Sequence, residues 1–218
     1  MTNPLAILCV IGSCISLQIG ASLGIQLFPH AGTWGTASMR LLMASAILLL
    51  ISRPKVHTWG REKWISATIF GVSLGLMNGF FYAGIDLVPL GPAVTIEFLG
   101  PLLLAAVLSR SLRDATCVTL ALIGMALLGV DSLTGEPLAP RGVVFLLLAG
   151  ACWAAYILAS KKAGALFSGQ DGLAVALLIG GITLLPLGST GAMVLVGDPW
   201  LLFIALGTGV LASLIPYS

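Results

Sequence analysis

A carboxylate stands in the middle of an apolar run, in the stretch VTIEFLGPLLLAAVLSR from Val94 to Arg110. An acid costs about 2.5 kcal/mol or more at the centre of a membrane helix, so it is a candidate functional group by default. Glu97 lies about six residues, roughly 9 Å, below the expected outer end of its helix. We expect Glu97 to face an aqueous cavity and to bind a proton or a substrate amino group. The alternative is a structural ion pair.

A proline follows Glu97 by four residues. Pro101 has no N–H to donate to the carbonyl four residues earlier, which belongs to Glu97 itself, and Gly100 loosens the same turn. The Gly100–Pro101 pair therefore predicts a helix break that leaves a free backbone acceptor beside the carboxylate. Broken helices at membrane depth are tolerated only where they line a cavity or are buried in protein.

Arg40 is the only basic residue inside a predicted membrane span. It lies about eight residues in from the same side as Glu97, so the two charges share a depth. An arginine would be unfavourable there alone and much less so beside a carboxylate. Two roles stay open for Arg40: a structural ion pair with Glu97, or binding of a substrate carboxylate through its planar guanidinium. Both side chains should face the bundle interior rather than lipid.

Other polar and aromatic side chains complete the expected lining. Asn78, Tyr82 and Asp86 recur every four residues and so share one face of a helix. Hydrogen bonds between helices would explain Asn78 and Tyr82 nearly as well as a cavity. The remaining candidates are Gln18, Trp153 and Tyr156, although the two aromatic residues could be ordinary packing. A stripe of small residues at the same spacing predicts close helix packing: Gly71, Gly75, Gly79 and Ala83.

The composition defines the class of protein that holds these residues. Of 218 residues, 58% are hydrophobic and only 8% are charged, whereas a soluble domain carries about a quarter charged residues. Apolar runs near 20 residues predict transmembrane helices, because open sheet edges cannot face lipid. We predict an all-α polytopic membrane protein of about eight spans, near 5–23, 32–51, 64–86, 91–109, 115–130, 142–160, 170–188 and 199–217.

The basic residues predict the orientation. Eight of the ten Lys and Arg residues fall in even-numbered loops, namely Arg53, Lys55, Arg61, Lys63, Arg110, Arg113, Lys161 and Lys162. Cytoplasmic loops carry an excess of Lys and Arg. The N-terminus and the even loops are therefore expected in the cytoplasm. The net charge of +2 gives no reason to expect a nucleic-acid partner.

An internal repeat is visible at an offset of 136 residues, which separates Trp64 from Trp200 and Gly71 from Gly207. The same offset lays the first predicted span on the sixth and the second on the seventh. Five spans per repeat is an odd number, so the copies would be inverted, as is typical of secondary transporters. We expect repeats over 1–130 and 131–218. The second repeat would lack two helices, so we expect a fragment of a ten-helix protein.

Enzyme motifs do not stand out in the sequence. There is no phosphate-binding P-loop and no HExxH motif, and we expect neither an enzyme nor a cofactor or metal. The cysteines, Cys9, Cys14, Cys117 and Cys152, have no metal-ligand spacing and should be small buried hydrophobes.

Three segments, VPLGPAVTIEFLGPLLLAAVLSR (88–110), GACWAAYILASKKAG (150–164) and LIPYS (214–218), resemble the drug/metabolite transporter superfamily. The similarity is greatest to EamA-like permeases of the threonine/homoserine exporter type. It implies two inverted five-helix repeats in a bacterial inner membrane, and export of small amino acids or related metabolites driven by protons. The family's EF-x-GP element falls on Glu97, Phe98, Gly100 and Pro101, and its membrane arginine on Arg40.

The expected partners are therefore a small-molecule substrate, protons and membrane lipid. One alternative is a broad-specificity efflux pump for cationic or amphipathic compounds, in which Glu97 matters and Arg40 does not. An intramembrane lipid-modifying enzyme would need a nucleophile and base at matched depth, and no Ser-His or Cys-His pair occurs within the spans. A non-transporting membrane subunit or fragment is the third alternative.

Overall fold

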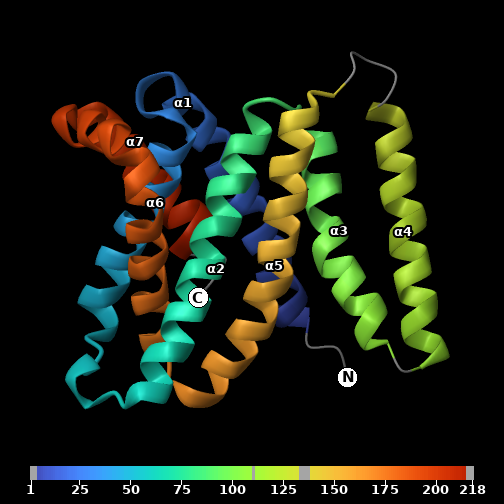
Figure 1. Cartoon of the computed structure of the whole chain (residues 1–218), viewed down its shortest axis with the longest axis horizontal. Coiled ribbons are helices and arrows are strands. Elements are labelled where there is room, and N and C mark those ends of the chain that lie inside the picture. The colour runs from blue at the N-terminus through green and yellow to red at the C-terminus, as the bar shows by residue number, and fades with distance from the viewer. Residues whose placement is uncertain (1–3, 110, 133–137, 215–218) are drawn as a thin grey trace.

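The computed structural model describes residues 4–109, 111–132 and 138–214. Helices make up nearly all of these residues and no strand occurs among them, which confirms the predicted all-α class (Figure 1). The elements are α1 (Pro4–Ser52), the short 3-10 helix η1 (Val56–Thr58), α2 (Arg61–Ile85), α3 (Leu90–Leu108), α4 (Leu112–Ser132), α5 (Pro140–Leu166), α6 (Asp171–Gly197), α7 (Pro199–Gly209) and the π-helical η2 (Val210–Leu214).

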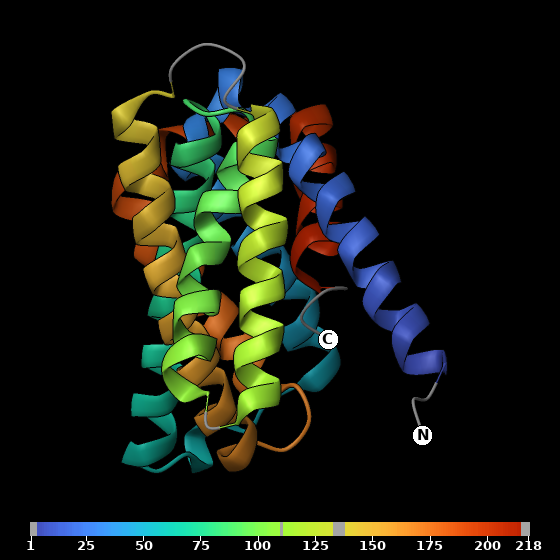
Figure 2. The same cartoon turned by 90° about the vertical axis from the view of Figure 1, so that its right-hand side faces the viewer.

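The first helix, α1, is two helices joined at Gly32. Gly32 has φ 64° and ψ 172°, a combination that residues with a Cβ rarely adopt. The chain reverses there, so the first half of α1 rises from the N-terminus and the second half descends to η1 (Figure 2). Counting α1 twice, the described residues form eight apolar helical segments, in agreement with the sequence.

Five of the described helices are long and apolar enough to cross a membrane, namely α1, α2, α3, α5 and α6, while α4 and α7 contain shorter apolar segments. The chain is thus a multi-pass membrane protein. The end of α6 was predicted wrongly, because the helix continues through Pro186 to Gly197 rather than stopping near residue 188. Proline inside a membrane helix is tolerated where neighbouring helices supply other partners for the freed backbone groups.

Small residues let the central helices approach closely. A Cβ on Gly75 would lie 2.6 Å from the backbone oxygen of Gly180, and one on Gly71 would lie 2.6 Å from that of Ala176. These contacts join α2 to α6 and confirm the predicted packing stripe. Two hydroxyl groups add bonds between α1 and α6, from Ser38 to the Gly181 carbonyl and from Ser45 to the Ala174 carbonyl, both at 2.9 Å. Membrane helices associate mainly through such packing and hydrogen bonds.

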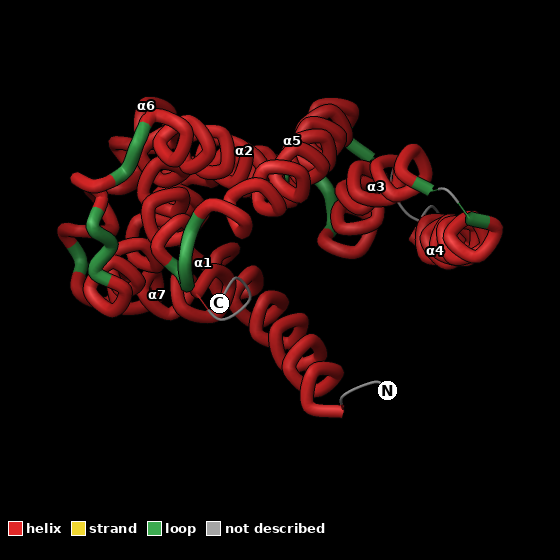
Figure 3. The backbone as a smooth tube through the Cα atoms, turned by 90° about the horizontal axis from the view of Figure 1, so that it is seen from below, coloured by secondary structure: helices red, strands yellow, loops and turns green. Residues whose placement is uncertain are grey.

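Two elements stand away from this centre. The beginning of α1 leans out of the bundle, and α4 stands at one edge beside α3 (Figures 2 and 3). Among the described elements, α4 packs chiefly on α3, which packs in turn on α5. The first half of α1 and helices α2, α3 and α5 therefore surround the space in which the candidate residues lie.

Candidate functional site

A cavity of about 530 Å³ lies between α1, α2, α3 and α5. Each helix contributes side chains to it at spacings of three or four residues, as expected for one helix face. The lining residues are Cys9, Ser13, Cys14, Leu17, Gln18, Ala21, Arg40, Met77, Asn78, Phe81, Val94, Glu97, Phe98, Trp153 and Tyr156. The two charges predicted inside the membrane, Arg40 and Glu97, therefore line the same cavity.

The buried Arg40 is held in place by a tyrosine. Its side chain is only 4% exposed. Nη1 donates a hydrogen bond of 2.9 Å to the Tyr82 hydroxyl, and the guanidinium carbon lies 4.8 Å from the centroid of the Tyr82 ring. Nε has no hydrogen-bond partner in the described part of the chain. A buried donor without a partner is unfavourable. Because Arg40 lines the cavity, its positive charge can attract an anionic group there.

Glu97 is also buried, at 8% exposure. No ion pair within 4.0 Å joins it to Arg40. Within the described residues, no hydrogen bond to the Glu97 carboxylate is found. The structure therefore does not have the direct Arg40–Glu97 ion pair that was one reading of the sequence. Both groups line one cavity without forming an ion pair with each other.

The predicted helix break at Gly100 and Pro101 is wrong. Helix α3 continues through both residues to Leu108. The Glu97 carbonyl, which Pro101 leaves without its usual donor, faces α5: a Cβ on Gly150 would lie 2.6 Å from this oxygen. The freed acceptor is thus covered by the crossing of two helices at Gly100 and Gly150. Close approach of neighbouring backbones at glycines is common between membrane helices.

Of the other predicted residues, some line the cavity and one is buried behind its lining. Gln18, Asn78, Trp153 and Tyr156 line the cavity, and Asn78 also donates a hydrogen bond of 2.8 Å to the Leu74 carbonyl. Tyr82 is fully buried and is not among the lining residues. It acts on the cavity through Arg40.

Several lining residues were not anticipated from the sequence. Leu17 and Met77 lie next to the predicted Gln18 and Asn78, and that position was the only signal for them. Phe98 had been named only as part of the EF-x-GP element, not as a lining residue. The cysteines were predicted to be buried, which is wrong: Cys9, Cys14 and Cys117 are exposed and Cys152 is half-buried, all as free thiols. Cys9 and Cys14 line the cavity.

A glycine makes room for the tyrosine that holds Arg40. A Cβ on Gly24 would lie 2.5 Å from the Tyr82 hydroxyl oxygen and 3.0 Å from Cζ. We expect Gly24→Ala to displace the ring and to lower the free energy of unfolding by about 1–3 kcal/mol. Tyr82→Phe removes the acceptor of Arg40 and should destabilise by a similar amount. Because Tyr82→Phe also removes the nearest clashing atom, the double variant should lose less stability than the two single losses added together.

Thermal unfolding of the purified protein in detergent measures all three variants. Strict additivity of the two substitutions would contradict the contact between Gly24 and the hydroxyl. Gly12→Ala on the same helix is the matched control, since a Cβ there meets nothing within 4 Å.

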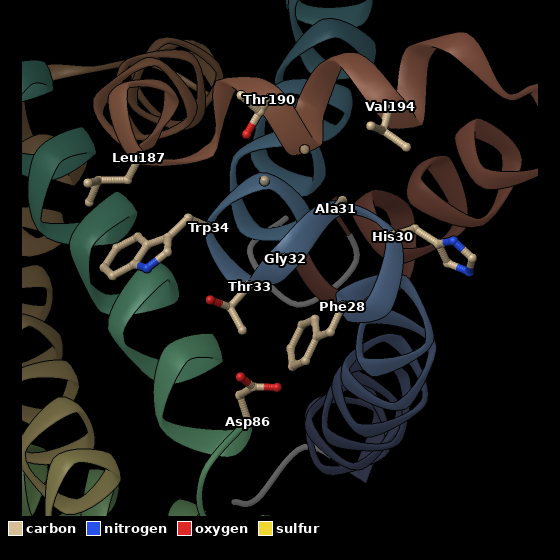
Figure 4. A pocket seen from close by; sticks show the side chains of 12 residues that line it. Phe28, His30, Ala31, Gly32, Thr33, Trp34, Asp86, Leu187, Thr190 and Val194 are labelled. Atoms are coloured by element: carbon tan, nitrogen blue, oxygen red, sulfur yellow. The ribbon is translucent and has the colours of Figure 1, made fainter.

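A second pocket of about 480 Å³ lies where α1 reverses. Asp86 at the end of α2 points toward Thr33 and Phe28 in this pocket, and His30 points away (Figure 4). Phe28 contacts Tyr82 with ring centroids 5.2 Å apart. The Phe28–Tyr82 pair therefore stands between this pocket and the cavity that holds Arg40.

A multi-pass helical membrane protein whose central cavity is lined by a buried arginine and a buried carboxylate belongs to the class of membrane transporters. Charged residues at that depth mark substrate and ion pathways.

Comparison with known proteins gives the family. The chain is 39% identical over 225 residues to a protein of Salmonella typhimurium (strain SL1344) named threonine/homoserine exporter RhtA, a match covering 98% of this chain and 72% of that protein. It is 37% identical over 215 residues to the Escherichia coli K12 protein of the same name, covering 99% of this chain and 72% of the relative. No family model and no solved structure matches. The chain belongs to the RhtA family of the drug/metabolite transporter (EamA-like) superfamily.

Proposed function

We propose that this protein exports small amino acids or related metabolites of the threonine and homoserine kind in exchange for protons. The single observation that carries the proposal is that Arg40 and Glu97 face one cavity without pairing with each other. The family assignment supports the substrate class, because the relatives are named threonine/homoserine exporters. Transport, rather than chemistry on the substrate, is the function that these names support.

The two charges suit the two ends of an amino acid. A guanidinium presents a planar fork of donors that matches a carboxylate, and the Arg40 side chain lines the cavity. The Glu97 carboxylate suits an ammonium group. We assign carboxylate binding to Arg40 and amine binding to Glu97, with Gln18, Asn78, Trp153 and Tyr156 completing the lining.

A single carboxylate that binds either a proton or an ammonium group gives exchange directly. When Glu97 takes a proton, it no longer attracts the amine and the substrate is released. When the proton leaves, the carboxylate binds the next substrate. One charge moved across 100 mV is worth about 2.3 kcal/mol, which is enough to drive export against a gradient.

The proposed setting is a bacterial inner membrane with the N-terminus in the cytoplasm. The positive-inside rule supports this orientation. Lys161 and Lys162, near the end of α5, support it as well, because they lie near the basic start of α2. There the Lys162 ammonium lies 3.8 Å from a Glu62 carboxylate oxygen. We also propose that 1–130 and 131–218 are inverted repeats, with the substrate site where the repeats meet.

Uptake into inverted membrane vesicles tests the proposal. Vesicles that contain the protein are energised with a proton gradient and given labelled threonine or homoserine. We expect uptake that requires the gradient and that excess unlabelled substrate suppresses. Absence of uptake of either amino acid would contradict the substrate class. Uptake of a cationic amphipathic dye instead, insensitive to Arg40→Gln, would favour the broad-specificity efflux pump.

A further inference from the structure

The polar face of α2 leads from the cavity to the second pocket. Asn78, Tyr82 and Asp86 follow one another at four-residue spacing, so each lies about 6 Å further along the helix than the one before. Asp86 keeps helical angles, φ −72° and ψ −25°, so the spacing holds to the end of the helix. Asn78 lines the cavity, and Asp86 lines the pocket of about 480 Å³ between α1, α6 and the end of α2. We call this pocket the Asp86 pocket.

Asp86 brings a negative charge to the Asp86 pocket. Its side chain is exposed and points toward Thr33 and Phe28 (Figure 4). Among the described residues, no basic side chain lies within 4.0 Å of the carboxylate, and no hydrogen bond to it is found. His30 is the one basic residue among the described lining residues, and it points away (Figure 4). The carboxylate can therefore pair with a cation that comes from outside the chain.

Aromatic rings accompany this charge. Phe28 and Trp34 both line the Asp86 pocket, and an ammonium group is attracted to the face of an aromatic ring, most strongly to that of tryptophan. A carboxylate beside aromatic rings suits an organic ammonium group. The volume of about 480 Å³ also falls within the roughly 300–1,000 Å³ that is usual for small-molecule sites.

We propose that the Asp86 pocket is a second binding site, which holds the ammonium group of the amino acid that the protein transports. The inference rests on the proposed function, in which Glu97 binds the same group in the cavity. The Phe28–Tyr82 ring pair, with centroids 5.2 Å apart, separates the two sites. A substrate bound to Asp86 has therefore passed this pair and left the cavity.

The two sites differ in what they require of a ligand. In the cavity, Arg40 and Glu97 hold both ends of the amino acid, whereas the Asp86 pocket holds the ammonium end and leaves the carboxylate in water. Ethanolamine has an ammonium group and no carboxylate, so it should bind the Asp86 pocket about as tightly as threonine does. N-acetylthreonine keeps the carboxylate and lacks the ammonium group, so it should not bind there.

Two native tryptophans provide the test. Trp34 lines the Asp86 pocket and Trp153 lines the cavity. The purified protein is labelled with fluorotryptophan, and Trp34→Phe and Trp153→Phe assign the two fluorine resonances. Threonine and ethanolamine should each shift the Trp34 resonance saturably, at concentrations within about threefold of each other, and N-acetylthreonine should leave it in place. Threonine should also shift the Trp153 resonance.

A pair of carboxylate variants makes the test specific to the Asp86 pocket. Asp86→Asn should weaken the response of Trp34 to ethanolamine by at least about threefold, because an ion pair is lost. The response of Trp153 to threonine should stay the same. Glu62→Gln, in the first turn of the same helix, should change neither response.

The outcomes separate the second site from the proposed function. The second site is overturned if the Trp34 resonance fails to respond to threonine or to ethanolamine, responds equally in Asp86→Asn, or responds to N-acetylthreonine as strongly as to threonine. A normal response of Trp153 to threonine would then leave amino-acid export from the cavity standing. Failure of both tryptophans to respond to threonine would overturn both.

Discussion

Replacing Glu97 by glutamine should abolish gradient-driven accumulation of threonine in inverted vesicles. Glutamine keeps the size of the side chain and loses both the negative charge and the exchangeable proton. One coupled proton at 100 mV supports about 50-fold accumulation, the equivalent of about 2.3 kcal/mol. Without the carboxylate, accumulation above the external concentration should disappear, since nothing in the cavity can exchange a proton for the amine.

A matched carboxylate serves as the control for this substitution. Glu62 lies on α2, the exposed partner of Lys162 at 3.8 Å, and an exposed ion pair of this kind contributes about 0–1 kcal/mol. Glu62→Gln should therefore accumulate threonine like the unmodified protein. Full accumulation by Glu97→Gln would contradict the proton-exchange role and leave Glu97 a structural residue.

Gly100→Ala should destabilise the protein strongly and also impair transport. A Cβ at this position would overlap the backbone carbonyl of Gly150 on α5. A backbone group cannot rotate away as a side chain can, so α3 and α5 must separate. We expect the free energy of unfolding to fall by about 1–3 kcal/mol. Because Glu97 lies one turn earlier on the same helix, its carboxylate moves with α3 and uptake should fall as well.

The same helix offers the comparison. A Cβ on Gly91 of α3 would meet nothing within 4 Å, so Gly91→Ala should be neutral or stabilising by up to about 1 kcal/mol. Thermal unfolding in detergent measures both variants. Equal stability of Gly100→Ala and Gly91→Ala would contradict the close contact between the Gly100 and Gly150 backbones at the α3–α5 crossing.

The helices were predictable from the sequence because membrane depth sets their length. Apolar runs near 20 residues predicted eight helical segments, and α2, α3 and α4 lie close to their expected ranges, whereas α5 continues six residues beyond its expected end. The helix through Pro101 was not predictable by the same argument. A proline weakens a helix locally, but whether the helix breaks depends on a neighbour, here the backbone of Gly150 on a distant segment.

The site was partly predictable for a related reason. An arginine and a glutamate at one depth in apolar runs indicated a shared cavity, and both face the same one. Their separation was not predictable, since sequence gives depth along a helix and not the distance between helices. The bond from Arg40 to Tyr82 depends likewise on a rotation of α2 that the four-residue polar track alone does not define.

Equilibrium binding of labelled threonine to the purified protein, compared with Arg40→Gln, tests the central claim most directly. We expect saturable binding by the unmodified protein, and a loss of affinity of at least about tenfold in the variant, because a charge-assisted bond to the substrate carboxylate is removed. Binding that is unchanged by Arg40→Gln would contradict the assignment of this cavity as the amino-acid site.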